Sequence, residues 1–114
     1  MGENESPIYN RTEAIARLEG DEALFAEMVN MFIAECETYC GAIEEALASG
    51  DAGALRREAH TMKSLLATFS FEGGRSLALE LEQQSALGDL SGLDGLVAQV
   101  VAAARQLAKA LAAA

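Results

Sequence analysis

The chain has 114 residues, and its eight Lys and Arg stand against 18 Asp and Glu, which gives a formal net charge of −10 at pH 7. A chain of this length builds one hydrophobic core and has no room for a second domain. The acidic charge argues against nucleic acid and against an anionic membrane surface as partners, because both repel a negatively charged protein.

The first ten residues precede any helical pattern, so we expect a flexible N-terminus over residues 1–10 and a single domain over residues 11–114. A short helix is predicted from about Arg11 to Leu18, before the break at Gly20-Asp21. Residues 1–6 lack the basic and apolar regions of a signal peptide. No apolar run is expected to reach the ~20 residues that span a bilayer. The sequence therefore predicts a cytoplasmic protein.

Four longer segments follow, and each places apolar residues at three- and four-residue steps, the spacing of one helix face. In chain order they are Asp21 to Ala48, Asp51 to about Phe69, about Gly74 to Leu87, and a segment with a capping-box-like start at Ser91-x-x-Asp94. Asp21 and Asp51 are the expected N-caps of their helices. Short loops imply that the helices alternate in direction. The predicted fold is all-α, an antiparallel up-down-up-down four-helix bundle with a short additional N-terminal helix.

The same spacing predicts the core. The expected core residues of the first long segment are Leu24, Phe25, Met28, Val29, Phe32, Ile33, Cys36, Cys40, Ile43 and Leu47. Those of the later segments are Leu55, Ala59, Met62, Leu66, Phe69, Leu77, Ala78, Leu81, Leu93, Val97, Val100, Ala104, Leu107 and Leu111. Cys36 and Cys40, four residues apart on one helix, are too far apart for a relaxed disulfide. We expect them to be reduced, packed thiols.

His60 is the only histidine of the chain. A lone helix histidine is most often an exposed residue without a task or a hydrogen-bonded core residue. At about 100° per residue, however, His60 lies about 140° from the apolar stripe, so it faces outward. Arg56, Lys63, Ser64 and Ala67 share this flank, and the small side chains of Ser64 and Ala67 leave the imidazole uncovered.

Positive charge also gathers at His60, although the chain as a whole is acidic. Arg56, Arg57 and Lys63 all lie within four residues of it. Such a spot attracts a small anion. Lys63, one turn from His60, could meet a phosphoryl oxygen on the imidazole as a point charge.

These residues carry a family resemblance. The run Ala59-His60-Thr61-Met62-Lys63-Ser64, followed by small residues and then by Leu79 to Glu82, resembles the signature of the histidine-containing phosphotransfer (HPt) domain family. The resemblance covers about residues 12 to 111. Two positions differ, because Ser64 and Ser70 stand where many members have Gly. Serine is small enough to keep His60 accessible, although the approach of a partner could change slightly.

The resemblance implies a function and a site. It implies that His60 is phosphorylated, that Lys63 stabilises the phosphoryl charge, and that Glu82 on the next helix orients the imidazole. The implied partners are receiver domains of response regulators and hybrid histidine kinases, which would bring Mg²⁺, whereas this chain would bind no metal or cofactor. The chain would then be a monomeric phosphoryl carrier and not an independent enzyme. Docking is expected on an apolar patch beside His60. Leu65, Leu66 and Phe69 lie too close to the core stripe to be assigned to this patch, so its residues stay open.

Two other functions remain as alternatives. One is the phospho-accepting module of a chemotaxis-type histidine kinase, which shares this bundle, although the chain shows no dimerisation or ATP-binding region. The other is an adaptor bundle that only binds partners, against which the presence of His60 argues. A di-iron or haemerythrin-like bundle needs several histidines, and a single histidine excludes it.

Overall fold

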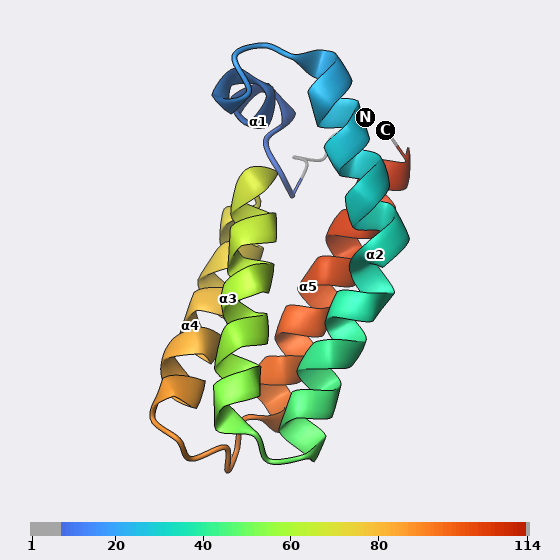
Figure 1. The fold of residues 1–114 in the computed structure, drawn as a ribbon. Helices are drawn as coiled ribbons and strands as arrows, with labels where there is room; N and C mark the ends of the chain where they lie inside the picture. The colour runs from blue at the N-terminus through green and yellow to red at the C-terminus, as the bar shows by residue number, and fades with distance from the viewer. Residues whose placement is uncertain (1–7, 114) are drawn as a thin grey trace, which may run out of the picture.

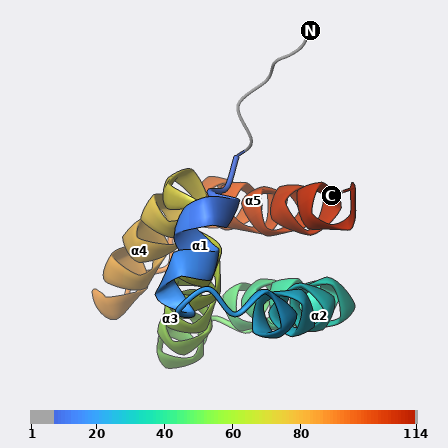
Figure 2. The ribbon, with the colours of Figure 1, turned by 90° about the horizontal axis from the view of Figure 1, so that it is seen from above.

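Five helices make up the described part of the chain, residues 8–113 of the computed structural model (Figure 1). They are α1 (Arg11–Arg17), α2 (Glu22–Ala48), α3 (Ala52–Thr68), α4 (Glu72–Ala86) and α5 (Asp94–Ala113). From α2 to α5 the helices alternate in direction, each packs against the next, and α5 closes the bundle against α2. Helix α1 lies across one end of the bundle (Figure 2). The predicted fold class is confirmed.

The helix starts follow the predicted caps in two cases and differ in two others. The Asp21 carboxylate accepts the Leu24 N–H at 2.9 Å, and the Asp51 carboxylate accepts the Ala54 N–H at 3.0 Å, as expected of N-caps. The prediction of a capping box at Ser91 is wrong, because α5 begins at Asp94. Ser91 instead donates hydrogen bonds to the Asp89 carboxylate in the preceding turn.

The start of α4 is also two residues earlier than predicted, at Glu72. The sequence predicts Gly74 as the first residue of this helix, but Gly74 lies inside it, where α4 approaches α3. A Cβ atom at this position would lie 2.9 Å from Cε2 of Phe71 and 3.0 Å from Cδ1 of Leu66. Gly74 therefore permits close packing between α3 and α4 and does not break the helix.

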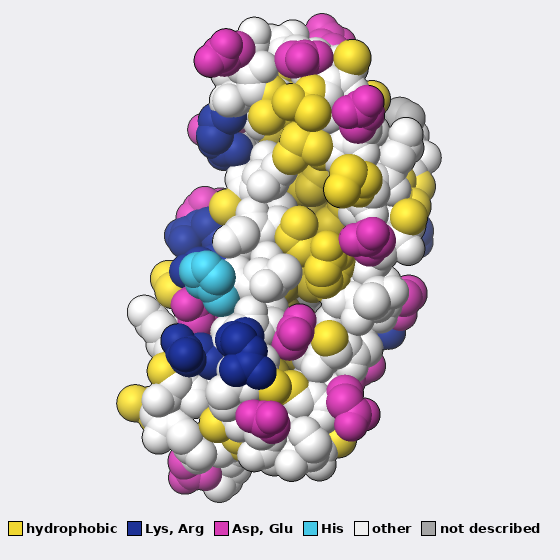
Figure 3. Space-filling view, in the orientation of Figure 1, with side chains coloured by type: hydrophobic (Ala, Val, Ile, Leu, Met, Phe, Trp, Pro, Cys, Tyr) yellow, Lys and Arg dark blue, Asp and Glu magenta, His cyan; other side chains and the backbone are white. Residues whose placement is uncertain are grey.

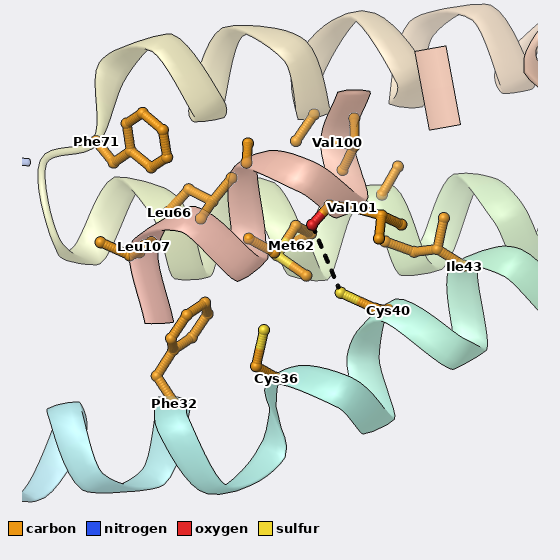
Figure 4. Packing of buried hydrophobic residues seen from close by; sticks show 14 of the residues in the cluster. Phe32, Cys36, Cys40, Ile43, Met62, Leu66, Phe71, Val100, Val101 and Leu107 are labelled. Carbon is orange, nitrogen blue, oxygen red and sulfur yellow. Dashed lines mark hydrogen bonds between the residues drawn. The ribbon is translucent and has the colours of Figure 1, made fainter. Parts of the chain in front are cut away.

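The core is built from the predicted faces of all four long helices (Figure 4). Every residue predicted for the core faces of α3 and α5 is buried. On α2 and α4, four predicted core residues are only partly buried, Met28, Val29, Leu47 and Leu77, and Leu24 and Ile33 on α2 are exposed. Cys36 and Cys40 are free and buried, as predicted. The Cys40 thiol donates to the Val101 carbonyl at 3.9 Å, and burial raises the pKa of Cys40 to about 12. Both thiols act as packed apolar groups.

Helix α5 corrects one expectation. Its 20 residues are long and apolar enough, by length and composition only, to cross a membrane. The prediction that no apolar run is long enough to span a bilayer is wrong, because alanines fill the positions between the valines and leucines of α5. In the bundle, the apolar face of α5 packs against α2 and α4 and is buried, as in the core helix of a globular domain.

Side-chain and backbone bonds hold α1 against the end of α3. The Arg17 guanidinium donates to the carbonyls of Ala67 at 3.0 Å and Thr68 at 3.3 Å, and also to the Ser70 hydroxyl. These carbonyls belong to the last turn of α3, which has no helical partners for them. Of the N-terminus predicted to be flexible, residues 1–7 lie outside the described residues, whereas Tyr9 is buried and Asn10 caps α1.

Candidate functional site

His60 lies midway along α3 on the outward face of the helix. Its side chain is 59% exposed, whereas Ala59 and Met62 beside it are fully buried. The sequence prediction that His60 faces solvent is confirmed. A large partner can therefore reach the imidazole without any rearrangement of the bundle.

Glu82 on α4 contacts the imidazole from one side. Its Oε2 atom lies 2.9 Å from Nδ1 of His60, and its side chain is only 20% exposed. An ionised carboxylate can only accept a hydrogen bond, so Nδ1 carries the proton when the ring is neutral. The other nitrogen, Nε2, then keeps its lone pair. This pairing brings together two residues that are 22 positions apart in the sequence.

Lys63 contacts the second oxygen of the same carboxylate. Its ammonium lies 2.8 Å from Oε1 of Glu82, an atom that is otherwise buried and has no hydrogen-bond donor of good geometry among the described residues. The Lys63 ammonium lowers the pKa of Glu82, against the effect of burial, and the contact with His60 lowers it further. Glu82 is thus held ionised. Whether Lys63 also stabilises a phosphoryl group stays a prediction.

The remaining predicted residues surround His60 on the same flank. Arg56 and Ser64 are exposed and Ala67 is half-buried. A hollow beside the imidazole is lined by Arg56, Arg57, His60, Thr61 and Glu82. The surface around the histidine is cationic, whereas acidic side chains are spread over the rest of this face (Figure 3).

An apolar groove between α2 and α3 is the feature that sequence reasoning did not assign. It is lined by Met28, Met31, Phe32, Glu35, Tyr39, Leu65, Thr68 and Phe69. The same face of the molecule shows apolar side chains gathered beside the histidine (Figure 3). Of the three residues that the sequence left open for docking, Leu66 and Phe69 are buried and Leu65 is half-buried. Met31, which is 61% exposed, lies outside the predicted apolar series.

Comparison with known proteins gives a family and a fold. The sequence model of the family described as Hpt domain matches residues 27–114. The structure resembles histidine-containing phosphotransfer protein B (HptB) from Pseudomonas aeruginosa, with a TM-score of 0.84 and 21% identity over 96% of this chain and 95% of that one. It also resembles the HPT domain of a hybrid sensor histidine kinase from Shewanella, with a TM-score of 0.81 and 14% identity over 93% of this chain and 92% of that one. No curated protein sequence matches the chain significantly.

Proposed function

This chain belongs to the Hpt domain family, and from that premise we propose that His60 is the residue that carries the phosphoryl group. Hpt domains act in histidine phosphotransfer in two-component phosphorelays and interact with receiver domains, and the chain shares that function. The observation that supports the choice of His60 is its geometry. The imidazole is exposed, and a half-buried carboxylate holds Nδ1 at 2.9 Å.

The proposed reaction is an in-line attack by Nε2 of His60 on the aspartyl phosphate of a receiver. A nitrogen–phosphorus bond forms, the phosphorus–oxygen bond to the aspartate breaks, and the aspartate leaves as a carboxylate. The ring becomes positively charged, because Nδ1 keeps its proton. Glu82 stabilises that charge, since its carboxylate already accepts the Nδ1 hydrogen bond. The reverse reaction delivers the phosphoryl group to a second receiver.

Lys63 is a positioning residue in this proposal. Its ion pair with Oε1 keeps Glu82 ionised and fixes the carboxylate in place, so that Oε2 remains against Nδ1. The resemblance implies a direct role on the phosphoryl group, whereas the contact that the structure gives the ammonium is the one with Oε1 of Glu82 at 2.8 Å. We therefore assign Lys63 to the support of Glu82.

The receiver is proposed to bring Mg²⁺ and most of the catalytic groups, because phosphoryl transfer needs chiefly positioning and charge neutralisation. This chain then contributes a nucleophile and a docking surface, with no catalytic activity of its own and no bound cofactor. We further propose that it acts as a cytoplasmic monomer. The buried apolar face of α5 agrees with a globular domain.

Transfer from labelled phospho-receivers tests the function. We expect wild type to take up acid-labile, alkali-stable label, and His60→Gln to take up none. Equal labelling of both chains would contradict the assignment of His60. If no receiver labels a wild-type chain that still binds receivers, the adaptor alternative replaces the carrier function.

The apolar groove is proposed as the receiver's docking surface, because it continues the face that exposes His60 (Figure 3). Met31→Ser should raise the receiver concentration needed for half-maximal transfer about tenfold, the loss expected for an apolar contact worth about 1.4 kcal/mol. Leu87→Ser is the matched control, because Leu87 is 76% exposed but lies after α4, outside the groove. Equal effects of the two substitutions would contradict docking at the groove.

A further inference from the structure

Most cations of this chain are already paired. Within residues 8–113 the structure pairs a carboxylate with each of Arg11, Arg17, Lys63, Arg75 and Arg105. The described residues offer no such partner to Arg56, Arg57 or Lys109. Two of these three lie beside His60.

Arg56 and Arg57 stand one turn before His60 on α3. Side chains of a helix lean toward its N-terminus, so the imidazole leans over the turn that carries these arginines. Both arginines line the same hollow as His60 and Glu82, and Lys63 does not line it. The positive charge that faces this hollow therefore comes from the arginines.

A phosphoryl group on Nε2 would need such charge. It carries close to two negative charges at neutral pH. The charged groups that line the hollow beside the imidazole are Arg56, Arg57 and Glu82, and Lys63 contacts Glu82. The Glu82 carboxylate repels the phosphoryl group, and Lys63 is held by Glu82. A guanidinium, in contrast, presents several donors in a planar fork that suits phosphoryl oxygens.

We propose that Arg56 and Arg57 bind the phosphoryl oxygens of phospho-His60, while Lys63 remains paired with Glu82. This inference rests on the proposed function, because it assumes that His60 is the phosphorylated residue. It assigns two roles to the cations around the histidine. The arginines stabilise the phosphorylated state, whereas in the unphosphorylated state Lys63 holds Glu82 in position against His60.

The test uses the isolated chain, phosphorylated chemically with phosphoramidate so that no receiver is needed. The phosphohistidine signal is followed by ³¹P NMR as a function of pH in wild type, in the double variant Arg56→Gln/Arg57→Gln and in Lys109→Gln. Loss of the two guanidinium groups should raise the last pKa of the phosphoryl group by roughly half to one unit. Lys109→Gln removes the same kind of charge from the exposed side of α5 and should titrate like wild type.

A double variant that titrates like wild type would overturn the inference. If its transfer from receivers were slower all the same, the arginines would belong to the receiver contact. Circular dichroism checks the fold of each variant. The two proposals fail in different experiments, because label on His60→Gln contradicts the site itself, whereas an unchanged titration contradicts only the role of the arginines.

Discussion

Removal of the Glu82 carboxylate should change the tautomer of His60. In wild type, Oε2 of Glu82 lies 2.9 Å from Nδ1 and keeps the proton on that nitrogen. A hydrogen bond to a charged acceptor contributes about 1.5–3 kcal/mol, but the imidazole is 59% exposed, so solvent screening leaves about 1 kcal/mol. This free energy corresponds to a factor of about five in the ratio of the two tautomers. Glu82→Ala should lower the ratio of rings with a free Nε2 lone pair to rings with a protonated Nε2 by that factor.

The measurement is direct because the chain has one histidine, so one pair of imidazole ¹⁵N signals reports the tautomer at alkaline pH. The initial rate of transfer from a phospho-receiver should fall in parallel, by at most about fivefold. Glu82→Gln should restore part of it, since an amide oxygen still accepts a hydrogen bond. Glu80→Ala, an exposed carboxylate on the same helix, is the matched control. An unchanged tautomer in Glu82→Ala would refute the reasoning, whatever happens to the rate.

Two further predictions concern stability. Lys63→Met should lower the free energy of unfolding at pH 7 by about 1 kcal/mol, because a half-buried ion pair is lost and the pKa of Glu82 rises, whereas Lys109→Met should have little effect. Folding lowers the pKa of Glu82, so the stabilisation by this ion pair is fully present above the ordinary pKa range of a carboxyl group. It disappears as the pH falls through the lowered pKa of Glu82. Urea unfolding at several pH values measures this dependence. Gly74→Ala should lower the free energy of unfolding by about 1 kcal/mol, because the new Cβ clashes with the buried ring of Phe71. Gly41→Ala should raise the free energy of unfolding by a similar amount, because its Cβ would have no neighbour within 4 Å. Thermal unfolding measures both changes. Equal shifts for the two alanine variants would contradict this explanation of the α3–α4 packing.

The fold was largely predictable because apolar spacing and caps act locally. The 4, 3, 4, 3 steps from Leu55 to Phe69 identify a buried face without any knowledge of its partners, and Asp51 marks the helix start through its own side chain. The error at the start of α4 arose because a tertiary contact overrides a local preference. Glycine usually weakens a helix, and the close approach of α3 explains why Gly74 lies inside α4.

The site was predictable to a smaller degree. The outward direction of His60 follows from helix geometry alone, and so does the presence of Lys63 on its flank. The sequence could not show that Lys63 binds Glu82, because that contact depends on the distance between two helices. The apolar groove was missed for a similar reason, since Met31 becomes part of a hollow only when α2 and α3 lie side by side.

The contact between α3 and α4 therefore determines more than stability. Glu82 reaches both His60 and Lys63 because α4 runs close to α3, and the absence of a side chain at Gly74 permits that approach at the start of α4. A wider separation would leave Nδ1 without its acceptor and both nitrogens of the imidazole open to water. The ring would then exchange between tautomers, and only part of the population would present Nε2 as a nucleophile. Packing at one end of α4 thus supports the chemistry two turns further along the same helix.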